Sequence, residues 1–333
     1  MVGKSENYRR YDIFHSGCLC REAAQTSCDP IGENAFAYFS SGAALASGMA
    51  GKSENLSRKQ IETGLKLRNG ALRYMKYKTI KNAFDHGKAF IPFITAGDPD
   101  LESTKEFILA MEKAGADLVE IGIPFSDPIA EGIVIQEADI RALASGTTTD
   151  RIFDMVAELR LETDMPLVFM GYLNPVFYYG YERFFSRCED VGISGIIIPD
   201  LPFEEKGECS EIAAGHGVDV ISMIAPTSED RIRAIASDAR GFLYVVSSMG
   251  VTGVRSEIKT DLASILAAIR QATDIPAGIG FGINTPEQAA EMAGLADAVI
   301  VGSAIVRIIA QHGKEAAPFI SEYVGKMKAA IRG

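Results

Sequence analysis

The 333-residue chain contains no tryptophan, only five cysteines, and no apolar run long and clean enough to cross a bilayer. The odd number and scattered spacing of the cysteines argue against a disulfide framework and favour a reduced, cytoplasmic setting. Basic residues are also in deficit, because 33 Lys and Arg face 44 Asp and Glu and leave a net charge of −11. This balance argues against a nucleic-acid partner. It does not exclude a small anion, since backbone N–H groups can hold a phosphate without Lys or Arg.

Cys18 and Cys20 form a C-x-C pattern beside His15, and all three are metal-ligand residue types. A structural zinc site needs four ligands at better spacing. Unpaired thiols in a poorly ordered segment are the simpler interpretation, and no metal site is predicted.

Residues 1–74 differ in composition from the rest of the chain. They hold 10 Lys and Arg against 7 Asp and Glu, whereas the remainder holds 23 against 37. The pentapeptide GKSEN occurs twice, at Gly3–Asn7 and Gly51–Asn55, and residues 40–50 have the Ser, Gly and Ala content of a flexible linker. The composition of residues 57–74 allows a basic helix. We predict that residues 1–74 are a poorly ordered N-terminal extension outside the barrel described next.

From Met75 to Gly333, short apolar runs rich in β-branched residues alternate with longer amphipathic segments. Eight strands, each followed by a helix, match a (β/α)8 TIM barrel in number and length, so residues 75–333 are predicted as a TIM-barrel catalytic domain. A doubly wound sheet is the alternative, but eight regular units without a break in order favour closure. The runs are Phe90–Thr95, Leu118–Ile123, Leu167–Met170, Gly195–Ile198, Val218–Ile224, Phe242–Ser247, Ala277–Gly280 and Ala298–Val301.

Acidic residues lie in and after the second predicted strand. In a barrel of this kind the active site lies at the carboxyl ends of the strands. Glu120 is inside the apolar run, and the loop that follows carries Asp127 and Glu131. A carboxylate at the barrel mouth is partly desolvated, which raises its pKa and makes it a usable general acid. Neutralisation by a neighbour is the alternative for Glu120, and simple loop solvation is the alternative for Asp127 and Glu131.

Other polar residues also follow predicted strands. Tyr172 and Asn174 come after the third strand, and Asp200 comes after the fourth. Tyr244, on the sixth strand, is expected to face the barrel interior. Turn chemistry remains an equal alternative for Asn174, and helix capping remains one for Asp200.

Glycine-bearing turns follow the last three strands, at Gly253, at Gly280 and Gly282, and at Gly302-Ser303. A helix is expected to start at Gly302-Ser303, and free N–H groups at a helix start bind anions. Barrels often place a phosphate in this quadrant. The weaker alternative is that the glycines only close tight turns. The residues alone therefore predict a barrel enzyme that acts on a small phosphorylated substrate with carboxylates as acids and bases.

Seven segments, in their order and spacing, resemble the tryptophan synthase alpha subunit family over about residues 75–333: FIPFITAGDPD, VEIGIPFSDP, MGYLNPVF, PDLPFEE, SSMGVTGVR, GIGFGI and VIVGSAIVRII. The resemblance implies retro-aldol cleavage of indole-3-glycerol phosphate to indole and D-glyceraldehyde 3-phosphate. It implies no metal and no organic cofactor in this chain. It also implies a partner, the PLP-dependent beta subunit, in an α2β2 heterotetramer.

The resemblance also implies roles for individual residues. Glu120 would protonate indole C3, Glu131 would hold the indole N–H in place of the family's usual Asp, and Tyr244 would lie near the substrate hydroxyls. The phosphate-binding positions would be Gly253, Gly282, Gly302 and Ser303, and the indole pocket would be lined by Phe93, Met170, Tyr172 and Phe281.

The sequence departs from the family pattern beside the second acid. AEGIV stands where ADGPT is common, so the longer Glu131 side chain must retract or the loop must move, and Ile133 replaces a stiffening Pro. Ser248 and Met249 replace a loop sequence that often carries Arg. One rival hypothesis is a non-catalytic scaffold that activates a beta subunit. Another is indole-glycerol-phosphate synthase, which would need a strand-end Lys that the predicted strands lack.

Overall fold

The computed structural model describes residues 65–68, 71–74, 77–246, 255–280 and 282–332. Of the predicted extension, only a two-stranded antiparallel pair is described, formed by β1 (Leu65–Arg68) and β2 (Ala71–Tyr74). These strands contradict the basic helix that composition allowed over 57–74. The dipeptide Asn69-Gly70 between them is the sequence signature of a two-residue hairpin loop. The rest of the extension, including Cys18 and Cys20, lies outside the described residues, and its boundary at residue 74 stays a prediction.

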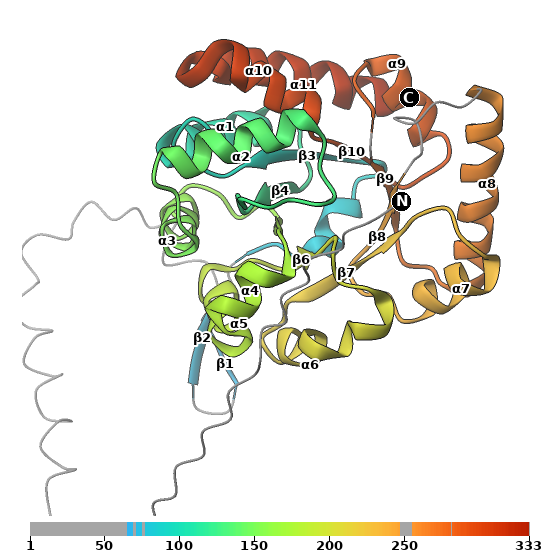
Figure 1. Cartoon of the computed structure of the whole chain (residues 1–333), viewed down its shortest axis with the longest axis horizontal. Helices are drawn as coiled ribbons and strands as arrows, with labels where there is room; N and C mark the ends of the chain where they lie inside the picture. Colours follow the sequence, from blue (N-terminus) through green and yellow to red (C-terminus); the bar gives the residue numbers. More distant parts are fainter. Residues whose placement is uncertain (1–64, 69–70, 75–76, 247–254, 281, 333) are drawn as a thin grey trace, which may run out of the picture. The chain divides into compact units, whose positions relative to one another are not determined.

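Eight parallel strands close into a barrel in the order β10-β3-β4-β5-β6-β7-β8-β9 (Figure 1). The predicted TIM barrel is confirmed, and three predicted strands have the predicted bounds. The strands are β3 (Ala89–Thr95), β4 (Val119–Gly122), β5 (Leu167–Met170), β6 (Gly195–Ile197), β7 (Asp219–Ile224), β8 (Leu243–Val246), β9 (Ala277–Gly280) and β10 (Ala298–Val301).

Helices surround this barrel and alternate with its strands, as the amphipathic segments between the apolar runs predicted (Figure 1). None of the described helices is long and apolar enough to cross a membrane. The helices are α1 (Leu101–Ala114), α2 (Ile133–Ala144), α3 (Thr149–Leu159), α4 (Leu173–Tyr179), α5 (Tyr181–Val191), α6 (Gly207–Gly215), α7 (Glu229–Ser237), α8 (Arg255–Ala272), α9 (Pro286–Ala293), α10 (Ser303–His312) and α11 (Ala317–Ile331), with the 3-10 turns η2 (Ile80–Phe84), η3 (Phe203–Glu205) and η5 (Gly313–Ala316).

The alternation of side chains along each strand divides the apolar core in two. One set lies between the strands and the helices and includes Val119 and Ile121 of β4. The other set fills the barrel interior and includes Val168, Ile197 and Ile300, with η2 packed beneath it. Because successive side chains in a strand point to opposite faces, Glu120 must point into the barrel. The strand pleat thus places a carboxyl group in an apolar interior.

A buried ion pair joins the last helix to the first barrel strand at the amino-terminal end of the barrel. Lys328 of α11 is only 5% exposed, and its Nζ lies 2.6 Å from Asp117 Oδ2 and 2.8 Å from the carbonyl oxygen of Lys88. The same Asp117 oxygen accepts a hydrogen bond of 2.7 Å from the N–H of Phe90. These contacts anchor α11 to the start of β3.

We expect Lys328→Met to lower the free energy of unfolding by about 2–3 kcal/mol, because it leaves Asp117 charged and largely buried without its cation. The matched control is Lys326→Met on the same helix, which removes an exposed pair with Glu322 and should cost less than about 1 kcal/mol. Urea unfolding at pH 7 measures both. Equal effects of the two substitutions would contradict the anchoring role of Lys328.

Candidate active site

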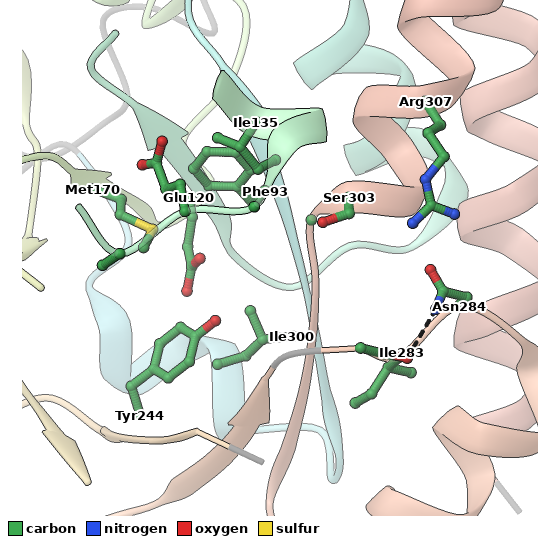
Figure 2. Close-up of a pocket in the computed structure, with 15 residues that line it drawn as sticks. Phe93, Glu120, Ile135, Met170, Tyr244, Ile283, Asn284, Ile300, Ser303 and Arg307 are labelled. Atoms are coloured by element: carbon green, nitrogen blue, oxygen red, sulfur yellow. Dashed lines mark hydrogen bonds between the residues drawn. The ribbon is translucent and has the colours of Figure 1, made fainter. Parts of the chain in front are cut away.

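A cavity of about 190 Å³ opens at the carboxyl-terminal mouth of the barrel (Figure 2). The structure brings eight of the predicted site residues together in its wall: Phe93, Glu120, Glu131, Met170, Tyr244, Gly282, Gly302 and Ser303. Gly253 and Phe281 lie outside the described residues, as do Ser248 and Met249. Tyr172 is described, but it does not line this cavity. The wall also contains residues that were not predicted as site residues, among them Ile135, Asn284, Ile300 and Arg307.

Glu120 lies on β4 between Phe93 of β3 and Val168 of β5 in the register of the sheet. It is fully buried, and neither carboxyl oxygen has a hydrogen-bond partner among the described residues. Burial raises the pKa of Glu120 to about 8. At neutral pH the group is therefore largely protonated, because an unpaired charge in this apolar interior would be costly. A protonated carboxyl group aimed into a cavity is a proton donor in position to act.

Tyr244 reaches the same cavity from β8, and its hydroxyl points into the open space (Figure 2). Burial, and after it the nearby charge of Glu120, raises the pKa of Tyr244, so the phenol stays protonated. The ring fits only because residue 280 on the neighbouring strand is Gly, since a Cβ atom there would collide with the Tyr244 hydroxyl and ring. The barrel is thus built to hold this phenol close to Glu120.

Glu131 ends the loop between β4 and α2, and its backbone carbonyl accepts a hydrogen bond of 2.8 Å from Gln136 Nε2. Its carboxyl group contacts the carboxyl group of Asp139, which is 4% exposed on α2. Burial raises the pKa of Glu131. Burial, followed by the charge of Glu131, raises the pKa of Asp139 to about 8. The loop carboxyl is therefore not a freely solvated acid, because it belongs to a half-buried pair.

Tyr172 supports this loop from below. It is 2% exposed, its hydroxyl oxygen accepts a hydrogen bond of 2.9 Å from the N–H of Ala130, and its ring centroid lies 5.4 Å from that of Phe125. Asp200 has a comparable role, because its Oδ1 accepts a hydrogen bond of 2.9 Å from the N–H of Leu173 at the start of α4. Asp200 thus caps a helix, although that helix precedes it in the chain, whereas capping of the following helix was the expected alternative.

The opposite end of the cavity offers donors to an anion. Gly302 and Ser303 lie at the start of α10, where backbone N–H groups carry the positive end of the helix dipole. Gly282 has φ of +78°, a conformation that favours glycine, and it lies beside Asn284 in the cavity wall. Arg307 follows one turn after Ser303 and adds a cation (Figure 2). The sequence signal for Arg307 was its spacing of four residues from Ser303 on one helix face.

Between these two ends the wall is apolar, with Phe93, Ile135, Met170 and Ile300 around the open space (Figure 2). The cavity therefore combines an apolar wall, a neutral buried acid, a second carboxyl group and an anion-binding end. Such an arrangement can bind an aromatic group joined to a phosphate and protonate a carbon of the ring. Among the described residues, no group of three His, Cys, Asp or Glu side chains lies close enough to hold a metal ion.

Comparison with known proteins places this geometry in one family. The family model described as "Tryptophan synthase alpha chain" matches residues 80–332. The alpha chain of Lacticaseibacillus casei is 49% identical over 257 residues, which cover 77% of this chain and 97% of that protein. The alpha chain of Lactiplantibacillus plantarum is 50% identical over 251 residues, covering 75% and 95%.

Solved structures agree with the sequence relatives. The alpha subunit from Legionella pneumophila str. Paris superimposes with a TM-score of 0.70 at 36% identity, covering 76% of this chain and 98% of that one. A chain of the tryptophan synthase a2b2 complex from Pyrococcus furiosus gives a TM-score of 0.68 at 36% identity, covering 73% and 99%. Because the matches span the whole barrel at these identities, the chain belongs to the tryptophan synthase alpha chain family.

Proposed function

We propose that this chain cleaves indole-3-glycerol phosphate to indole and D-glyceraldehyde 3-phosphate, the alpha reaction of tryptophan biosynthesis, with Glu120 as the acid. As a member of its family the chain is a carbon–carbon lyase. The observation that carries the assignment to Glu120 is a fully buried carboxyl group without a hydrogen-bond partner among the described residues, in the wall of a cavity that ends at a helix start. No lysine lines that described cavity, which disfavours indole-glycerol-phosphate synthase chemistry.

The proposed first step is the transfer of the Glu120 proton to indole C3. The ring lies in the slot formed by Phe93, Ile135, Met170 and Ile300, and the phosphate is held by the N–H groups of Gly282, Gly302 and Ser303, with Gly253 as a further predicted ligand. Protonation at C3 leaves a positive charge on the ring and turns the ring into a leaving group. The bond between C3 and the glycerol carbon then breaks, and its electron pair returns to the ring.

Glu131 acts on the ring nitrogen, which receives electrons in this step, and Tyr244 acts near the glycerol hydroxyl, which supplies them. The Glu131 carboxylate accepts the indole N–H and stabilises the positive charge that develops on the ring nitrogen. As the aldehyde forms, the glycerol hydroxyl at the broken bond gives its proton to the carboxylate that Glu120 became in the first step, and Tyr244 lies in the wall beside Glu120 to position that hydroxyl. The side chains supply all proton transfers in this scheme, so it uses no cofactor in this chain.

A beta subunit is the proposed partner, as PLP-dependent enzyme and as acceptor of indole in an α2β2 heterotetramer. One of the similar solved structures is titled as the a2b2 complex of Pyrococcus furiosus. This chain carries large exposed apolar side chains in the β4–α2 loop, at the start of α2 and on α4: Ile129 (81%), Ile133 (67%), Phe177 (62%) and Tyr178 (91%). We infer that these side chains form one interaction surface. The surface and the cavity share the β4–α2 loop.

A purely non-catalytic scaffold is disfavoured by the energetics of Glu120. A scaffold has no use for a carboxyl group whose ionisation is opposed by burial, because that group makes the fold less stable as pH rises. Retention of such a group fits an enzyme that gives up some stability for a proton donor.

Glu120→Gln should lower kcat by about 10²- to 10⁴-fold in the presence of the beta subunit, because it keeps the shape of the side chain and removes the proton. The assay is indole formation from indole-3-glycerol phosphate. Glu137→Gln on the exposed face of α2 is the matched control and should retain turnover. Unchanged turnover in Glu120→Gln would sink the assignment of Glu120 as the acid.

The same substitution should raise stability in a pH-dependent way. In the folded protein the pKa of Glu120 is raised to about 8 from 4.5, so between these values the folded state binds more protons than the unfolded state. Stability is therefore lost as pH rises through that window. We expect Glu120→Gln to be more stable than the wild-type protein by on the order of 3 kcal/mol at pH 8 and nearly equal at pH 5. Urea unfolding at both pH values tests this, and equal stability at pH 8 would contradict it.

Phe177→Asp should weaken binding of the beta subunit by tenfold or more, because it places a charge among these exposed apolar side chains. Leu161→Asp is the control, since Leu161 is 71% exposed but follows the far end of α3. Isothermal titration with the beta subunit measures both Kd values. The docking proposal fails if Phe177→Asp binds normally.

A further inference from the structure

We propose that Asp139 is a positioning residue, which as a neutral carboxylic acid donates a hydrogen bond to the Glu131 carboxylate and holds it against the indole N–H. This inference deepens the proposed function and rests on the role given there to Glu131. It concerns a residue of α2 that neither lines the cavity nor contacts the substrate.

Contacts at Asp139 fix one carboxyl group against the other. Asp139 is 4% exposed, it accepts a hydrogen bond from the backbone N–H of Phe125, and its side chain contacts that of Glu131. Glu131 Oε2 is buried and has no hydrogen-bond partner among the described residues. Glu131 therefore has its carboxyl group held by α2 while the residue itself lines the cavity. That arrangement suits an acceptor for a ligand N–H.

No nearby cation among the described residues is free to neutralise the carboxyl groups of Glu131 and Asp139, so a proton shared between them is what stabilises the contact. Asp98, 1% exposed, is a further carboxylate whose charge acts on Asp139, and both of its oxygens are bonded at 2.8 Å to Nε and Nη2 of Arg141. Arg141 is thus engaged and does not neutralise Glu131 or Asp139. Tyr172 also faces the pair, and its hydroxyl oxygen accepts from Ala130. Two contacting carboxylates without a cation repel each other, so one of them keeps its proton.

The position of each carboxyl group decides which one keeps the proton. Glu131 faces the cavity, where a positive ring requires an anion, whereas Asp139 lies behind it and never meets the ligand. Burial and the charge of Glu131 raise the pKa of Asp139 to about 8, which matches a donor that is still protonated at neutral pH. The extra methylene of Glu131 then has a purpose, because it lets the carboxyl group reach back to α2.

The test measures binding of indole-3-propanol phosphate, which lacks the hydroxyl needed for cleavage, between pH 7 and 9.5. The chain has no tryptophan, so the indole fluorescence of the probe is free of tryptophan background. All variants carry Glu120→Gln, because Glu120 also titrates near pH 8 and would obscure the result. The alkyl phosphate is a dianion throughout this range, since its second pKa is about 6.

In the Glu120→Gln background we expect the Kd to rise about tenfold per pH unit above pH 8, because Asp139 loses its proton and repels Glu131. Adding Asp139→Asn should abolish this rise, since the amide donates at every pH, and adding Asp139→Ala should weaken binding about tenfold at all pH values. Adding Glu137→Gln, on the exposed face of the same helix, should change nothing. Urea midpoints verify that each variant is folded, and if Asp139→Ala does not fold, the Asp139→Asn profile decides alone.

An unchanged alkaline loss of binding in Asp139→Asn would overturn the inference, as would normal binding in Asp139→Ala. Failure of the underlying function looks different. If the single variant Glu131→Gln, with Asp139 and Glu120 intact, turns over indole-3-glycerol phosphate at the wild-type rate, then Glu131 has no catalytic role. In that case the proposed function is wrong at Glu131, whatever the pH profile of the Asp139 variants shows.

Discussion

The strand pleat of β4 is the constraint on which the site depends. Val119 and Ile121 pack outward under the helices, so the residue between them must face the barrel interior. That residue is Glu120, and the interior supplies it with no hydrogen-bond partner among the described residues. The core therefore works against ionisation of the group that it positions. Its acidity is a property of the whole barrel, because every apolar side chain around the mouth contributes to the desolvation.

Helix α2 connects features that the sequence keeps apart. Its Ile135 forms part of the cavity wall, its Asp139 contacts Glu131, and its Arg141 holds Asp98 in the loop after β3. Its first residue, Ile133, is 67% exposed. A protein that bound over this exposed side would press on the same helix that sets the geometry of the acid pair. Coupling between partner binding and chemistry would then need no movement of the barrel.

Much of this architecture could be predicted from the sequence because its signals are local. β5, β9 and β10 begin and end where apolar runs meet Pro, Gly or acidic residues, and Gly302-Ser303 marks the start of α10. Helix α2 gave no clear signal, because exposed Ile133 and Ile140 blur the apolar face formed by Ile135 and Ala138. The pairing of β1 with β2 departs from the expected basic helix for another reason, because the positive charge of this segment suggests a helix whereas the Asn-Gly dipeptide in its sequence favours a hairpin.

Within the site, the residues that were missed depend on tertiary contacts. Asp139 is an ordinary helix residue until the loop before α2 folds back and places Glu131 against it. Tyr172 was expected in the indole pocket, but its hydroxyl satisfies the N–H of Ala130 and draws the ring under the loop. A polar side chain at a strand end can serve either the ligand or the backbone, and spacing along the chain does not distinguish the two.

The pairing of the last barrel strand with the first sets the order in which the parts of the active site form during synthesis. β10 pairs with β3, so Ala298 and Ala89, separated by most of the domain in sequence, are neighbours in the closed sheet. Glu120 and Glu131 leave the ribosome early, whereas Gly302, Ser303 and Arg307 follow the last strand. During synthesis the two proposed catalytic acids are therefore present long before the proposed phosphate-binding residues. The cavity forms only when β10 has paired with β3 and closed the barrel. Because the substrate binds only to the closed barrel, the phosphorylated substrate stabilises the closed barrel relative to the unfolded chain.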